Sequence, residues 1–104
     1  MAVFTYEIAT DIVLPNITVE RQYADGVHIA YRVRPNEGYV LHNPALDVSY
    51  EDEFGNEIFE QYYYRETIIP VQQIPSTWGW EAVLESDVPA DMIFGVGDND
   101  HEIA

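Results

Sequence analysis

The sequence predicts an all-β protein, a small antiparallel sandwich or barrel of about six or seven short strands built from hairpins. Apolar and polar residues alternate along several short stretches, as they do in strands with one buried face. Glycine, proline, asparagine and aspartate separate these stretches, which is typical of turns. Eight tyrosines and many β-branched residues also favour strands, and no segment has the pattern of a strong amphipathic helix.

The chain is expected to form a single β domain over residues 1–94, followed by an acidic, flexible tail over residues 95–104. Residues 3–9 alternate and predict a first strand. Residues 12–14 are a short apolar run that ends at Pro15. This run either continues the first strand past a bend or crosses over to the next hairpin.

Residues 17–34 carry the clearest hairpin signal, because alternation runs on both sides of Asp25-Gly26. A two-residue loop would divide the apolar side chains between the two faces of the sheet. A three-residue loop over residues 24–26, with a bulge at Gly26, gathers nearly all of them on one face, so we predict this loop. Its pairs are Tyr23 with Val27, Arg21 with Ile29, Val19 with Tyr31 and Ile17 with Val33.

The opposite face of this hairpin is predicted to contact solvent. It holds Thr18, Glu20, Gln22, His28, Ala30, Arg32 and Arg34. Arg21 is the exception on the inner face. Because a buried, unpaired guanidinium is very unfavourable, we expect Arg21 at a rim or paired with an acid.

A second hairpin is expected after a type I turn at residues 35–38 and a short strand at residues 39–42. Gly55 has the place in it that Gly26 has in the first hairpin. The predicted three-residue loop pairs Asp52 with Asn56, Tyr50 with Ile58 and Leu46 with Tyr62. In this register Glu51 lies opposite Glu57, a like-charge pair that local stability alone would not select.

The C-terminal part predicts two more strands and one turn of helix. Residues 67–74 are β-prone, but Pro70 confines them to a sheet edge or a bulge. Residues 78–85 alternate, which predicts a strand with both tryptophans in the core. Residues 86–92 resemble a single helical turn.

Charge is the unusual property of this chain, which has 19 acids, 4 arginines and no lysine, for a net charge of −15. Residues 1–50 contain six acids and three arginines, a net of −3, whereas residues 51–104 contain thirteen acids and one arginine, a net of −12. Direct binding to nucleic acid or to an anionic membrane is disfavoured, because both depend on basic side chains. The field of the chain would attract a basic protein surface.

Five acids are concentrated on the second hairpin: Glu51, Asp52, Glu53, Glu57 and Glu60. One interpretation is a solvated edge that prevents strands of different molecules from pairing. The other is a binding site for an Arg/Lys-rich surface, since carboxylates on alternate strand residues lie about 6.6–6.8 Å apart and imitate a phosphate backbone. We take these five residues as the candidate partner-binding site.

Catalytic and metal-binding signatures are missing from the sequence. There is no cysteine, no lysine and no Gly-x-Ser-x-Gly motif, so an enzyme is not expected. The three histidines lack ligand spacing, and residues 98–102 do not complete a calcium loop, so no metal or cofactor is expected. No apolar run could span a bilayer and no signal peptide is recognisable, so a cytoplasmic protein is expected.

In size and charge the chain resembles inhibitors that phages and mobile elements direct against nucleic-acid-handling defence enzymes, anti-CRISPR proteins among them. The resemblance implies a small intracellular inhibitor that mimics nucleic acid and engages a basic protein surface. The alternative is a structural protein, such as a phage-particle component, that forms homo-oligomers through the edge at Pro70 or through residues 62–64. The oligomeric state and the partner are open at this point.

Overall fold

Strands make up most of the protein, which confirms the predicted all-β class. The computed structural model describes residues 3–95 and 97–98 of the chain. The strands are β1 (Phe4–Ile8), β2 (Ile17–Ala24), β3 (Val27–Pro35), β4 (Tyr39–His42), β5 (Val48–Glu51), β6 (Glu57–Glu60), β7 (Tyr63–Tyr64), β8 (Thr67–Pro70), β9 (Glu81–Leu84), β10 (Ile93–Phe94) and β11 (Gly97–Asp98). Four 3-10 turns connect them: η1 (Pro44–Leu46), η2 (Pro75–Thr77), η3 (Glu85–Asp87) and η4 (Ala90–Met92).

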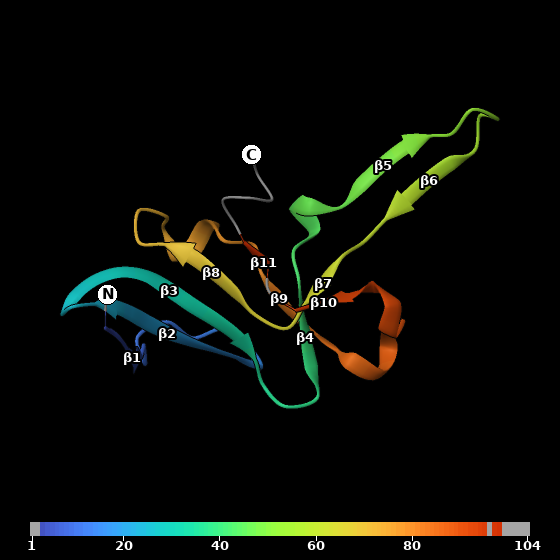
Figure 1. The fold of residues 1–104 in the computed structure, drawn as a ribbon. Helices are drawn as coiled ribbons and strands as arrows, with labels where there is room; N and C mark the ends of the chain where they lie inside the picture. Colours follow the sequence, from blue (N-terminus) through green and yellow to red (C-terminus); the bar gives the residue numbers. More distant parts are fainter. Residues whose placement is uncertain (1–2, 96, 99–104) are drawn as a thin grey trace.

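The strands form three separate sheets (Figure 1). The first has five strands in the order β1-β2-β3-β8-β11, and the second has four in the order β10-β7-β4-β9. The third consists of β5 and β6 alone. Pairing is antiparallel, as predicted, except for the two-residue strands β10 and β11, which run parallel to β7 and β8.

The main core draws side chains from both larger sheets. Val19, Val33 and Ile69 come from the five-stranded sheet, and Leu41 and Tyr64 come from the four-stranded sheet. Both tryptophans complete this cluster, so their predicted burial is confirmed. Tyr63, next to Tyr64 in β7, stacks on a histidine instead, because consecutive strand residues point to opposite faces.

The predicted loop of the first hairpin is wrong. Ala24 pairs with Val27, so the loop has two residues, and Asp25 and Gly26 adopt φ of 50° and 84°. Two consecutive left-handed residues are typical of the type I′ turn, whose twist matches that of the strands. Ile29 then has no partner on β2, because Tyr23 lies opposite His28 and Gln22 lies opposite Ala30. The bulge at Ile29 adds one residue to β3, which brings the apolar side chains of both strands to the same face although the loop has only two residues.

This shift changes every later pair of the hairpin. Val19 lies opposite Val33, Arg21 opposite Tyr31 and Glu20 opposite Arg32. Val27, predicted to face inward, is exposed beside the turn. The face predicted to contact solvent is partly covered: Glu20, Gln22 and Ala30 are buried, and their strands β2 and β3 lie in the middle of the sheet, between β1 and β8.

The predicted first strand and the turn after β3 are both present, but the type of the turn differs from the prediction. β1 is confirmed, and residues 12–14 leave it to form a bend before the hairpin, with Leu14 bridged to Ile17. The turn after β3 is bonded from Tyr39 N to the Asn36 carbonyl at 3.0 Å. Gly38 has a φ of 90° there, which fits a type II turn rather than the predicted type I.

Two C-terminal predictions need correction. The strand predicted over residues 78–85 begins only at β9, because Gly79 with a φ of 74° interrupts the extended chain. The predicted helical turn at residues 86–92 is replaced by η3 and η4. The tail predicted over residues 95–104 stays a prediction: β11 lies within it, and its residues 96 and 99–104 lie outside the described residues.

Candidate functional site: an acidic arm

The five acids that the sequence singles out lie on one hairpin that projects from the rest of the molecule (Figure 1). This hairpin, residues 48–60, contains β5, a turn and β6, and we call it the acidic arm. Among the described strands, β5 and β6 pair only with each other. The molecule is elongated accordingly, with extents of 54 × 29 × 27 Å.

The turn of the acidic arm has the predicted three-residue form. Gly55 N donates to the Asp52 carbonyl at 3.1 Å, and Asp52 N donates to the Asn56 carbonyl at 2.9 Å. Gly55 has a φ of 80°, a conformation that glycine adopts without steric penalty. Tyr50 lies opposite Ile58, as predicted. The turn residues and the alternation therefore select the same register.

The predicted pair of Leu46 and Tyr62 is wrong. Leu46 belongs to η1, where the Asn43 side chain accepts a hydrogen bond from Ala45 N at 3.1 Å. Pro44 fits the first position of this turn because the backbone N–H that proline lacks would have no partner within the turn. The strand β5 can begin only after η1, so the ribbon of the acidic arm is shorter than the alternation of residues suggests.

Three of the five acids are displayed at the outer half of the acidic arm. Glu51 and Glu57 are direct cross-strand partners, as predicted. Asp52 and Asn56, the next pair towards the turn, are hydrogen-bonded through their backbones. Because bonded and non-bonded pairs alternate, Glu51 and Glu57 form a non-hydrogen-bonded pair, in which the side chains are close. Glu53 is exposed in the turn, and Glu57 accepts a hydrogen bond from Ser49 Oγ at 3.2 Å. No positive charge lies between residues 48 and 60.

The other two acids are engaged within the arm. Asp52 Oδ1 accepts hydrogen bonds from Asn56 N and Phe54 N, both at 2.9 Å. These donors lower the pKa of Asp52, the bond from Asn56 N most of all. Glu60 accepts hydrogen bonds from the hydroxyls of Tyr50 and Tyr62, and the first raises the pKa of Tyr50. Asp52 therefore stabilises the turn of the acidic arm, and Glu60 binds tyrosine hydroxyls at its base.

A buried polar contact fixes the base of the acidic arm. His42 Nε2, at the end of β4, lies 2.9 Å from Asp47 Oδ1, one residue before β5. The His42 ring stacks on Tyr63 with a centroid distance of 5.1 Å. Gln61 Nε2 donates to the other Asp47 oxygen at 3.5 Å. The chain entering the arm and the chain leaving it are thus joined at Asp47.

All four arginines pair with acids outside the acidic arm. The nitrogen–oxygen distances are 2.7 Å for Arg21 and Asp11, 3.0 Å for Arg32 and Glu20, 2.6 Å for Arg34 and Glu20, and 3.0 Å for Arg65 and Glu85. The predicted pairing of Arg21 is confirmed. None of the five candidate residues takes part in an ion pair with the described residues. The arginines therefore neutralise some acids of the body and none of the arm.

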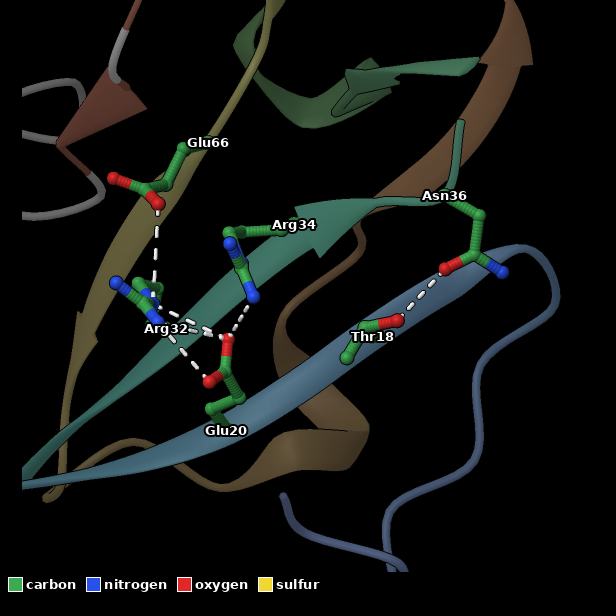
Figure 2. Close-up of polar contacts among 6 residues, drawn as sticks. All are labelled: Thr18, Glu20, Arg32, Arg34, Asn36 and Glu66. Carbon is green, nitrogen blue, oxygen red and sulfur yellow. Dashed lines mark hydrogen bonds and ion pairs between the residues drawn. The ribbon is translucent and has the colours of Figure 1, made fainter. Parts of the chain in front are cut away.

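The largest of these clusters lies on the five-stranded sheet (Figure 2). Glu20 accepts from both Arg32 and Arg34, while Glu66 Oε1 lies 3.9 Å from Arg32 Nε. The Arg32 guanidinium also stacks on Tyr6 at 3.7 Å. Burial alone would raise the pKa of Glu20, but the hydrogen bonds and charges of the two arginines outweigh it, and the pKa is lowered.

The exposed aromatic residues of the acidic arm were not predicted from the sequence. Phe54 at the tip is 80% exposed, and Phe59, on the same face as Glu51 and Glu57, is 58% exposed. The signal for Phe54 was present, because a residue in the middle of a three-residue turn cannot be buried by its own hairpin. The contact of His42 with Asp47 had no recognisable signal at their separation of five residues.

In the part of the chain that the structure describes, no three His, Asp or Glu side chains converge as a metal site would require. No helix among these residues is long and apolar enough to cross a bilayer. No protein-family model, no curated protein and no solved structure matches the chain.

Proposed function

We propose that this protein is a binding protein whose acidic arm engages an Arg/Lys-rich surface of another protein. The observation that carries the proposal is the separation of charge within one small molecule. All four arginines pair with acids of the body, while five acids that form no ion pair with a described residue lie on a narrow projecting ribbon. A projecting group of like charges steers an oppositely charged partner during encounter.

The class of partner that we propose is a nucleic-acid-handling enzyme, which the arm would inhibit by occupying its basic groove. Glu51, Glu53 and Glu57 present three carboxylates around one end of a ribbon that is open on both faces. Such a ribbon can enter a groove that is built for a phosphate backbone. Inhibition of this kind would need no catalytic group of the arm.

Self-assembly through the segments considered above has less support. β7, which contains two of the three consecutive tyrosines, lies between β4 and β10. β8, which ends at Pro70, lies between β3 and β11. Since strands of the same chain occupy both sides, neither segment offers a whole open edge to a second copy. A stable oligomer in light scattering, without affinity for basic proteins, would favour assembly instead.

The proposal is tested by capture of partners from a host lysate at rising salt. We expect a nucleic-acid-binding protein whose capture weakens steeply with ionic strength. A triple variant should abolish the capture while its circular dichroism spectrum is unchanged: Glu51→Gln, Glu53→Gln and Glu57→Gln.

The matched control removes the same charge from the body. Three exposed acids there have no ion pair with described residues: Glu7, Glu37 and Asp91. Their Gln, Gln and Asn substitutions should leave capture nearly unchanged. If the arm and body variants lose capture equally, net charge rather than the arm is responsible, and the site assignment is wrong.

A further inference from the structure

The acidic arm is a sheet of only two strands, and no other described strand covers its outer edges or its faces. An isolated two-stranded ribbon is marginally stable in water, and a third strand is what normally stabilises it. Val48 and Tyr50 in β5 are 42% and 47% exposed, although residues of their type are usually covered in sheets. The arm thus has an incomplete sheet.

The backbone of β5 shows where a third strand would bind. Hydrogen-bonded and non-bonded pairs alternate in an antiparallel ribbon, and the bond from Asp52 N to the Asn56 carbonyl sets the phase. Ser49 and Glu51 therefore direct their N–H and C=O groups away from β6. Neither residue has another backbone bond to the described residues. This edge has free donors and acceptors at alternate positions.

The side chains of β5 define the composition of the strand that fits. Ser49 and Glu51 share one face with Glu57, and Val48 and Tyr50 share the other. A strand added beside β5 would place alternate side chains next to Ser49 and Glu51, with Glu57 beyond them on β6, and next to Val48 and Tyr50. A second copy of the arm would bring like charges together, which is destabilising. The complementary strand alternates basic and apolar residues.

We propose that the outer edge of β5 takes up an extended segment of the partner, in which Arg or Lys alternates with apolar residues, as a third strand of the acidic arm. This rests on the proposed function, because it assumes a basic partner, and it adds the mode of recognition. Main-chain hydrogen bonds to Ser49 and Glu51 supply affinity, and the alternation of side chains supplies specificity. A purely electrostatic contact would need neither main-chain hydrogen bonds nor alternating side chains.

The test uses a short peptide of alternating arginine and valine and two N-methylated forms of it. One form is methylated at every arginine and the other at every valine, so all three peptides carry the same charge and side chains. Because successive N–H groups of a strand point to opposite sides, only one set can bond to β5. We expect one methylated form to bind at least tenfold more weakly than the parent in calorimetry, and the other to bind like the parent.

Equal affinity of all three peptides would overturn the third strand and leave the basic-surface proposal standing. Absence of binding by the parent peptide would also overturn it, while the lysate capture tests the proposed function separately. On the protein side, Ser49→Pro removes one outward N–H of an edge strand, a position that tolerates proline. It should weaken the parent peptide at least tenfold, whereas Ser49→Ala, which removes only the hydroxyl, should not; equal affinities of these variants would contradict the assignment to β5.

Discussion

Replacing Glu20 with glutamine separates acids that stabilise this fold from acids that it displays. Glu20 is buried and accepts charged hydrogen bonds from Arg32 at 3.0 Å and from Arg34 at 2.6 Å. The variant keeps the size of the side chain and removes its charge. The guanidinium groups of Arg32 and Arg34 then lose their main partner. Water can compensate the charge of Arg32 only in part, because its side chain is only 21% exposed. The fold should therefore be destabilised.

The size of the effect follows from the surroundings of each arginine. Removing one partner of a buried ion pair costs about 3–5 kcal/mol. The Arg34 side chain is 46% exposed, and Glu66 remains 3.9 Å from Arg32, so both charges retain some compensation. We expect a loss near the lower end, about 3 kcal/mol in the free energy of unfolding.

The assay is urea unfolding followed by the fluorescence of the two buried tryptophans. Glu51→Gln is the matched control, because Glu51 is exposed and lies opposite another acid, Glu57. Relief of this repulsion should stabilise the control variant by about 0.2–1 kcal/mol. A loss below about 0.5 kcal/mol for Glu20→Gln, or equal losses for both variants, would refute the division of acids into paired and displayed groups.

The pH dependence of stability provides a second readout of the same cluster. The pKa of Glu20 is lowered from its usual 4.5 in the folded protein, so the stabilisation is fully present above about pH 4.5. It is lost as the pH falls through the folded-state pKa. Asp11 acts in the same direction, since its hydrogen bond to Arg21 lowers its pKa to about 2. Glu20→Gln should therefore lose less stability than the wild type between pH 4.5 and the acid limit.

Two further substitutions test contacts that hold the body and the base of the arm. Gly79→Ala should lower the free energy of unfolding by about 2–4 kcal/mol, because Gly79 has a φ of 74° and an added Cβ would lie 2.9 Å from Asn43 Oδ1. Gly38→Ala, with a φ of 90° and open space, should lose only about 1–2 kcal/mol; equal losses in urea would contradict the role of the contact. Asp47→Ala should lose about 1–3 kcal/mol by leaving the buried His42 without its 2.9 Å partner. Amides of the acidic arm should also exchange faster in this variant, and unchanged exchange would show that the contact does not fix the arm.

The second hairpin was predictable because its local signals agree. Gly55 supplies the left-handed residue that closes the turn, and the alternation of the flanking residues demands the same register. The first hairpin has two signals that conflict. Asp25-Gly26 favours a two-residue turn, whereas the alternation requires an odd number of intervening residues. The chain satisfies both with the bulge at Ile29, in β3. This strand pairs with β2 on one side and with β8, distant in the sequence, on the other.

Burial of the tryptophans was likewise predictable from their size and spacing, but their backbone was not. Trp78 and Trp80 are both buried, yet Gly79 between them turns the chain out of the extended conformation. The Asn43 side chain donates to the Trp78 carbonyl at 2.8 Å and holds this turn. That contact joins residues 35 positions apart in the sequence, so no local pattern carries it.

By itself, the sequence determined the all-β class, the excess of negative charge and its concentration on the second hairpin. Only the tertiary structure decided which of these acids remain free. Glu20 and Glu51 both stand at polar positions of alternating hairpin strands. Arg21 follows Glu20 in the sequence, but it pairs with Asp11 and does not neutralise Glu20. The bulge places Glu20 opposite Arg32, where two guanidinium groups neutralise it, whereas Glu51 lies opposite Glu57 on a ribbon that no arginine reaches. The physical reason is that compensation of a charge depends on which strand lies beside it, and strand pairing is a long-range property of the chain.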